Sequence, residues 1–154
     1  MNIKFLINGS DVTPGSVIRK VADECTEEVS QKLVSKSVRI VNVLRNNALK
    51  VLSGTRSGKQ YKRPDTIRRE ESNYYRASAP GEPPAVRTGE LMKNWNPYVS
   101  VEGSGLNARI LAGIESGMPY AGHLEHGTSR MAPRPYVERI KEKALPEVKR
   151  ILSD

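Results

Sequence analysis

The sequence contains few of the residues that most often build catalytic or metal sites. Its 154 residues include one cysteine, Cys25, and two histidines, His123 and His126. A single cysteine excludes an intrachain disulfide and any metal site with several cysteine ligands. Cys25 falls on the apolar spacing of a predicted helix, so we expect a small buried apolar side chain rather than a reactive thiol.

Aromatic residues and long apolar runs are also scarce. Aromatic residues make up 5% of the chain and apolar residues 37%, which predicts a small core for one domain of this length. No run approaches the ~20 apolar residues of a membrane span. The short apolar stretch at residues 3–7 lacks the charged start and the cleavage site of a signal peptide. We therefore expect no membrane contact and a protein that works or assembles in the cytoplasm.

Positive charge is abundant and unevenly distributed. The net charge is +8, and residues 54–93 carry nine basic side chains against five acidic ones. The densest part is "RSGKQYKRPDTIRR", residues 56–69. Its charge fits contact with nucleic-acid phosphates, and it fits equally a solvated loop that keeps the protein soluble. The sequence pI of about 9.7 keeps a DNA-binding protein among the candidate functions.

A single apolar stripe runs through the first third of the chain. Thr13 and Pro14 form a typical helix start, with a hydroxyl cap followed by proline at the first helical position. Apolar residues then recur at steps of three and four, without internal proline, up to "SGTRSG" at 53–58. The stripe consists of Val17, Ile18, Val21, Cys25, Val29, Leu33, Ile40, Leu44, Ala48, Val51 and Leu52. A helix of nearly forty residues is longer than a compact domain of this size is wide. We expect it either to break near residues 35–37 or to project and contact another molecule.

The rest of the chain alternates short strands and short helices. Before the hairpin we expect a strand at 3–7, an exposed polar loop at 54–73, a strand at 74–78, and a helical turn at 88–95 held by Leu91, Met92 and Trp95. We then expect a hairpin at 98–114 and a short helix within 119–129 that is closed by Gly127. A last helix should run from Pro135 to about Leu152, interrupted or kinked at Pro146. This order predicts an α+β fold, with a small antiparallel sheet packed by a long N-terminal helix and a C-terminal helix. We expect one domain, residues 1–154, with an exposed basic loop at 54–73.

Fragments that suggest catalysis do not fit the spacing that the chemistry needs. The segment "GTRSGKQ" at 54–60 has one residue too few between its glycines for a phosphate-binding loop, and Gln60 replaces the hydroxyl that binds Mg²⁺. In "HLEH", His123 and His126 are three residues apart, whereas a zinc protease helix needs four. A deaminase would need a paired cysteine motif. We therefore expect a protein that is not an enzyme and that needs no cofactor or catalytic metal.

Two proline segments stand out instead. Residues 80–84 and 133–135 each lie close to a Thr-Gly or Gly-Thr pair, at 88–89 and 127–128. Proline fixes φ and removes a backbone donor, so such segments are extended and lose little chain entropy when they dock. Each segment is either a docking element or an ordinary surface loop.

The residues of these segments carry a resemblance. "SAPGEPPAVRTGEL" (78–91), followed by "YAGHLEHGTSRMAPRPYVERI" (120–140), resembles the tail-completion, or head–tail joining, proteins of long-tailed bacteriophages. The matching positions are Ser78 to Pro84, Thr88, Gly89 and Leu91, then Tyr120, Ala121, Glu125, Gly127, Thr128, Pro133, Arg134, Pro135 and Tyr136. The match covers roughly residues 74–145. The chain departs from the family at His126, where an aromatic residue is common, and in its long basic stretch at 55–73.

The resemblance implies a structural virion protein of the phage neck, assembled in the host cytoplasm. It implies a ring, commonly sixfold, around the DNA conduit, with head-closure or connector proteins and tail-terminator or tail-tube proteins as partners. We expect the subunit or partner interface to include Pro80, Gly81, Pro83, Pro84, Thr88, Gly89, Glu125, Gly127, Thr128, Pro133, Arg134 and Pro135. We expect contact with DNA or an acidic neighbouring ring from Arg56, Lys59, Lys62, Arg63, Arg68 and Arg69. The alternative function is that of a basic DNA-binding protein that acts outside a virion.

Overall fold

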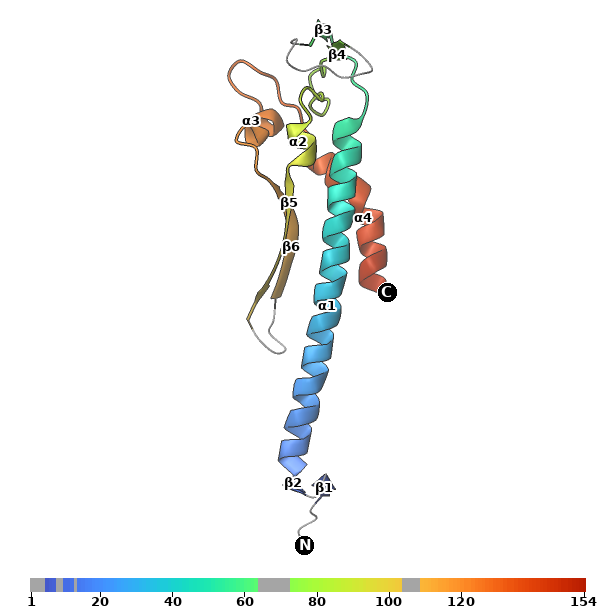
Figure 1. Ribbon diagram of the computed structural model, residues 1–154, viewed down its shortest axis with the longest axis vertical. Helices are drawn as coiled ribbons and strands as arrows, with labels where there is room; N and C mark the ends of the chain where they lie inside the picture. The colour runs from blue at the N-terminus through green and yellow to red at the C-terminus, as the bar shows by residue number, and fades with distance from the viewer. Residues whose placement is uncertain (1–4, 8–9, 13, 64–72, 104–108) are drawn as a thin grey trace.

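The structure, a computed structural model, describes residues 5–7, 10–12, 14–63, 73–103 and 109–154, with side chains described from residue 23 onward. It has the predicted α+β architecture. A long N-terminal helix, α1, a C-terminal helix, α4, and a two-stranded antiparallel sheet form the body (Figure 1). The molecule is elongated along α1, with the N-terminal residues at one end and a small hairpin, β3–β4, at the other.

Helix α1 is continuous from Pro14 to Ser53, a length of 40 residues. At ~1.5 Å per residue it is about 60 Å long. The alternative of a break near residues 35–37 is therefore wrong, and the alternative of a projecting helix describes the molecule. The predicted start at Pro14 and the predicted end at "SGTRSG" are both confirmed.

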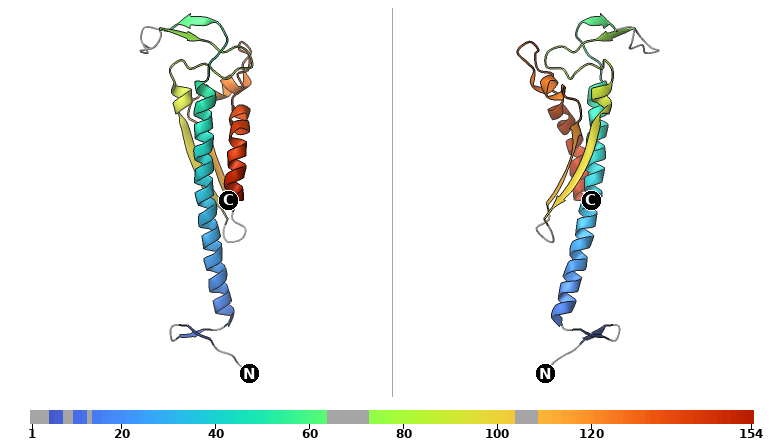
Figure 2. Two further views of the ribbon diagram at one scale, coloured as in Figure 1. Left: turned by 90° about the vertical axis from the view of Figure 1, so that its right-hand side faces the viewer. Right: turned by 60° about the vertical axis from the view of Figure 1, so that its left-hand side comes forward.

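Within residues 23–53 of α1, whose side chains are described, the C-terminal part is covered. Its buried residues begin at Ser37, and none occurs between residues 23 and 36. Strands β5 and β6 pack on one side of this half and α4 packs on another (Figure 2). The C-terminal end of α4 reaches the middle of α1, where Lys36 Nζ donates to the Leu152 carbonyl at 3.2 Å. Beyond that point α1 extends past the end of α4 toward β1 and β2.

The main sheet is the predicted hairpin. Strand β5 spans Trp95–Glu102 and β6 spans Arg109–Ser116, paired antiparallel from Trp95↔Ser116 to Glu102↔Arg109. Side chains alternate between the two faces of a strand. One face therefore carries an apolar row that includes Val99, Ala112 and Ile114, together with Trp95, and this row accounts for the packing of the hairpin on α1.

Helix α4 spans Val137–Ser153 and completes the core. One buried cluster joins α1, the short helix α2 (Glu90–Lys93), β5 and the start of α4, and consists of Ala48, Val51, Leu52, Leu91, Trp95, Tyr136 and Ile140. A second, smaller cluster joins Val43 of α1 to Ala144 and Ile151 of α4. Pro146 lies inside α4 and does not end it. The predicted anchors Leu91 and Trp95 are both buried.

Two small hairpins lie outside the main sheet. Strands β1 (Phe5–Ile7) and β2 (Ser10–Val12) pair beside the N-terminal end of α1. Strands β3 (Gln60–Lys62) and β4 (Tyr74–Arg76) pair at the other end. The basic stretch that we expected to be a loop therefore contributes one strand. Its residues 64–72 lie outside the described part of the chain.

Candidate functional site

The two proline segments lie against each other at the end of the molecule that carries β3 and β4. The Gly81 amide donates to the Pro133 carbonyl at 3.2 Å. Arg134 Nη1 donates to the Ser78 carbonyl, and Arg139 Nη2 donates to the Gly81 carbonyl at 2.9 Å. Segments about 50 residues apart in the sequence are thus joined within one protomer, and we name this pair of segments, residues 78–84 and 133–139, the proline clamp.

Arg56 connects the proline clamp to the end of α1. Its guanidinium donates to the carbonyls of Val51 at 2.9 Å and Leu52 at 3.3 Å, which are left without helical partners at the helix end. The same group donates to the Pro84 carbonyl at 3.1 and 3.2 Å, and to Gly54 at 2.7 Å. Burial lowers the pKa of Arg56, while Glu82 opposes that change. Arg56 therefore acts as a C-terminal cap of α1 that also holds the first proline segment.

Glu82 holds the same loop from the other side. Its carboxylate accepts from the Ser57 hydroxyl at 2.6 Å, from the Ser57 amide at 3.1 Å and from the Ala79 amide at 2.9 Å. These three hydrogen bonds favour the ionised form, led by the one from the Ser57 hydroxyl, and lower the pKa of Glu82 to about 2. Since all three partners lie in the loop after α1 or in the first proline segment, Glu82 fixes one to the other.

Glu125 plays a matching role at the start of α4. It lies in α3 (Ala121–His126), and its Oε2 accepts from the amides of Tyr136 at 2.9 Å and Val137 at 3.2 Å. A carboxylate at the first turn of a helix satisfies free amides and interacts favourably with the helix dipole. Tyr136 is buried, donates to the Ala121 carbonyl at 3.0 Å and meets Trp95 edge to face at 6.1 Å. Burial, followed by the charge of Glu125, raises the pKa of Tyr136 to about 12.

Gly127 is required by the backbone. It has φ of 77° and ψ of −177°, a combination that essentially only glycine adopts. A Cβ at this position would lie 2.7 Å from the Met131 carbonyl oxygen. The residue ends α3, as predicted, and begins the tight turn in which the Thr128 amide donates to Met131 at 2.8 Å.

The predicted interface residues are divided between the interior and the surface. Pro83, Pro84 and Gly89 are buried within the protomer. Glu125, Gly127, Arg134 and Pro135 are half-buried, and the first three of these have the internal contacts given above. The exposed members are Pro80, Gly81, Thr88, Thr128 and Pro133. A neighbouring molecule can therefore reach the exposed residues directly, while the buried residues shape the segments that carry them.

The predicted basic set is divided in the same way. Arg56 is committed to carbonyls of its own chain, and Arg63 Nη1 donates to the Arg87 carbonyl at 2.7 Å. Lys59 and Lys62 are exposed on the β3–β4 hairpin. Arg68 and Arg69 lie outside the described residues. The sequence did not point to Arg76 or to the tyrosines that surround these lysines.

A groove of about 660 Å³ lies between the two matching stretches. Its walls include Pro84, Leu91 and Met92 on one side and Tyr120, Leu124 and Met131 on the other. It is open to solvent and predominantly apolar, so it can receive an apolar side chain of a neighbouring molecule.

A second surface of interest is the uncovered half of α1. Val29 is 56% exposed and Leu33 is 43% exposed, and Cys25, one turn before Val29, is also exposed. The prediction that Cys25 is buried is therefore wrong. Cys25 lies on the predicted apolar stripe, but among the described residues of this part of α1, 23–36, no side chain is buried. We call residues 25, 29 and 33 the open stripe.

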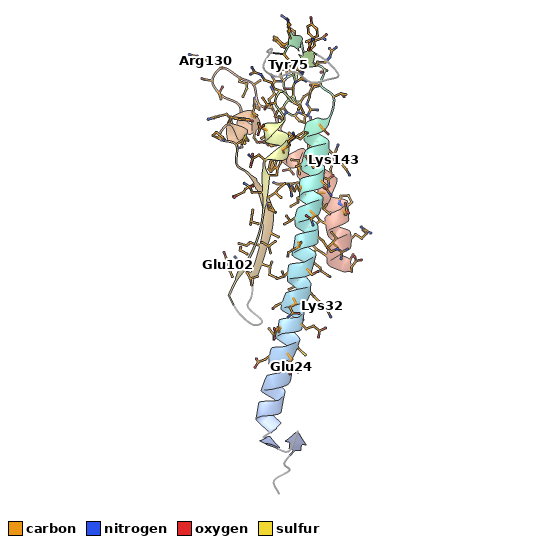
Figure 3. All side chains as sticks on the ribbon, in the orientation of Figure 1. Glu24, Lys32, Tyr75, Glu102, Arg130 and Lys143 are labelled. Atoms are coloured by element: carbon orange, nitrogen blue, oxygen red, sulfur yellow. The ribbon has the colours of Figure 1, made fainter. Side chains whose placement is uncertain are left out.

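Charges of both signs lie beside the open stripe. Lys32 is exposed at its edge and pairs with Glu28 at 2.8 Å, whereas Glu24 and Glu27 are exposed on the opposite side of the helix at ~100° per residue. Figure 3 shows Glu24 and Lys32 on this half of the helix, far from the hairpin that carries Tyr75. An exposed apolar stripe of this kind suits a partner with an apolar surface.

Among the described residues no group of three or more histidine, cysteine or acidic side chains is arranged to hold a metal ion. Among the same residues, no helix combines the length and the apolar character needed to span a membrane. Comparison of the chain with protein-family models, with curated proteins and with solved structures finds no match in any of the three.

Proposed function

We propose that the protein is a structural component of the neck of a long-tailed bacteriophage. In this proposal it completes the end of the tail and joins it to the head, as one subunit of a ring around the DNA conduit. The resemblance of residues 78–91 and 120–140 supports the assignment to the neck. The geometry of the protomer supports the more general role of an assembly protein.

The observation that carries the proposal is the open stripe. Apolar surface exposed to water is unfavourable by roughly 25 cal/mol per Å², and a helix that projects alone loses the tertiary packing that stabilises most protein helices. Both costs are removed when another molecule covers the projecting half of α1. A protein built in this way gains stability from assembly.

A second copy of the same chain is the partner that we propose for the open stripe. A closed ring needs two different complementary faces on each subunit. The open stripe at one end of the molecule and the exposed proline clamp at the other give two distinct faces of that kind.

In the assembled virion we expect a sixfold ring. Its further partners would be head-closure or connector proteins on one side and tail-terminator or tail-tube proteins on the other. The exposed residues of the clamp and of its neighbouring turns, Pro80, Gly81, Thr88, Thr128 and Pro133, remain the predicted contacts with adjacent subunits or rings.

The experiment is sedimentation analysis of the purified protein over a wide concentration range. We expect the wild type to self-associate from its 17.1 kDa protomer and the double variant Val29→Asp/Leu33→Asp to remain monomeric, because buried aspartates would replace apolar contacts. Maleimide labelling of Cys25 should be rapid in the dilute protomer and slow in the associated protein.

The matched control is Gln31→Asp/Val38→Asp. It adds the same two charges to the same helix, and residues 29 and 38 lie about 180° apart around the axis at ~100° per residue. This control should associate like the wild type. Wild-type protein that stays monomeric at millimolar concentration, or a control that is equally defective, would contradict a role for the open stripe.

The second candidate, a basic DNA-binding protein that acts outside a virion, is favoured by one observation, the exposed basic hairpin β3–β4. The two functions differ in whether the active protein is a monomer or an oligomer. A monomer that binds DNA tightly and never associates supports the second candidate, whereas association through the open stripe supports the first.

A further inference from the structure

The described strands of the β3–β4 hairpin carry no buried side chain. Its strands read Gln60-Tyr61-Lys62 and Tyr74-Tyr75-Arg76, and all but Tyr75 are exposed. It holds three of the six tyrosines of the chain. Isolated two-stranded hairpins are marginally stable in water, and this one is placed at the end of the molecule, away from the body (Figure 1). Its side chains therefore serve a surface rather than a core.

One face of the hairpin consists of stacked rings that carry cations. Tyr61 and Tyr75 are directly opposite in the register, and their rings stack with centroids 5.9 Å apart. Lys59 Nζ lies 5.8 Å from the centre of the Tyr61 ring, and Arg63 lies 5.5 Å from that of Tyr75. The attraction between cation and ring holds both charges in place on this face.

The opposite face carries the same kind of residues. Side chains alternate along a strand, so Lys62 and Arg76 point away from the stacked rings, together with Tyr74. Tyr74 is 50% exposed, and Arg76 Nη1 donates to the Gly58 carbonyl at 3.4 Å. No ion pair involves Lys59, Lys62 or Arg76 within the described residues. Both faces of the hairpin therefore present positive charge.

The rigid base of the hairpin aims it outward from the body. The Gly58 amide donates to Ala77 at 2.9 Å and the Ala77 amide donates to Lys59 at 2.9 Å, so the pairing continues past the strands. A Cβ at Gly58 would lie 2.6 Å from the Ala77 carbonyl oxygen. Arg56 and Glu82 then tie this base to the proline clamp and to α1.

We propose that the β3–β4 hairpin binds in a groove of duplex DNA, with its two charged faces toward the two phosphate backbones. A major groove admits a two-stranded ribbon, and a ribbon with cations on both faces needs anions on both sides. A flat acidic protein surface would neutralise the positive charge on only one of the two faces of the hairpin. Lysine, arginine and tyrosine side chains all bind phosphate oxygens, and such contacts do not depend on base sequence. The inference rests on the proposed function only in naming DNA as the nucleic acid.

A single hairpin offers few contacts, and its affinity should be weak and salt-dependent. In a ring, several hairpins would meet one duplex, and the linked contacts would raise the apparent affinity without any new interaction. The hairpins would then centre the DNA while allowing it to slide, because phosphate contacts have no fixed register along the duplex.

The test measures binding of the full chain to a fluorescent 30-base-pair duplex at several salt concentrations. Lys59→Gln removes a charge from one face and Lys62→Gln from the other. We expect each variant to lose roughly tenfold in affinity at 50 mM salt and to reduce the slope of log K against log salt by about 1, and the double variant to reduce it by about 2. Charge-conserving Lys59→Arg/Lys62→Arg should bind like the wild type.

The matched control is Lys143→Gln/Lys149→Gln on α4, which removes two exposed charges from another surface. An equal loss in this control would show that net charge alone attracts DNA and would overturn the proposal. An effect of only one of the two hairpin lysines would overturn docking in a groove. Competition by polyglutamate as strong as that by duplex DNA would indicate an acidic protein partner instead.

Sedimentation of the same hairpin variants separates this inference from the proposed function. The hairpin variants should associate like the wild type, and the Val29→Asp/Leu33→Asp protomer should still bind the duplex. Loss of DNA binding without loss of association would leave the assembly role intact, and the reverse result would leave the hairpin contact intact.

Discussion

The two halves of α1 share one apolar stripe and differ in what covers it. In the C-terminal half, Ala48 is fully buried and Leu52 is 2% exposed, because β5, β6 and α4 pack against them. In the N-terminal half, Val29 and Leu33 continue the same three-and-four spacing of apolar residues and remain exposed. A sequence pattern therefore shows which side of a helix is to be covered, and only the fold shows whether the same chain covers it.

The largest expected effect separates the two halves directly. Leu52→Ala should lower the free energy of unfolding by about 2–5 kcal/mol, since it leaves a cavity in the main cluster. Leu33→Ala should lower it by about 1 kcal/mol or less in the dilute protomer. Urea denaturation at low micromolar concentration measures both. Similar losses for the two variants would mean that the open stripe is covered within the protomer.

A second prediction concerns the covered end of α1, where two basic residues three positions apart have different roles. Arg56→Ala removes charged hydrogen bonds to the carbonyls that end the helix and to Pro84, and should cost roughly 1–3 kcal/mol. Lys59→Ala, on the exposed hairpin, should stay within about 0.5 kcal/mol of the wild type. Thermal denaturation at pH 7 compares them. An Arg56→Ala protein as stable as Lys59→Ala would contradict the capping role.

The smallest effect is a dependence on acid at the same end of the molecule. The pKa of Glu82 is about 2 in the folded protein against an ordinary value of 4.5. Since the folded value is the lower one, its hydrogen bonds stabilise the protein above pH 4.5, and this contribution is lost as the pH falls toward 2. Glu82→Gln should be less stable than the wild type at pH 7 and should converge with it near pH 2. A constant difference across this range would rule out the carboxylate as the cause.

Much of the fold followed from local sequence signals. Thr13 and Pro14 marked the start of α1, and the glycines after Ser53 marked its end. The alternation around Val99 and Val101 predicted the main hairpin, and Gly127 ended α3 as expected. These features depend on neighbouring residues, so the sequence alone was sufficient to predict them.

The features that sequence reasoning missed depend on distant residues. Cys25 was placed on the correct side of the helix, but whether that side is covered depends on where α4 ends. Arg56 was assigned to a basic patch because its acceptor Pro84 lies 28 residues away. The pairing of Tyr61 with Tyr75 joins residues 14 positions apart in the sequence. Nothing local to any of these positions indicates its partner.

The order in which the chain is synthesised gives the second core cluster a further consequence. Val43 of α1 packs against Ala144 and Ile151, about 100 residues later in the chain. At ~5–20 residues per second, a ribosome needs on the order of 5–20 s to add that stretch. Throughout that interval the part of α1 that α4 will cover is exposed, in addition to the open stripe. The nascent protein therefore offers a longer apolar surface to chaperones and to neighbouring nascent chains than the finished protomer does.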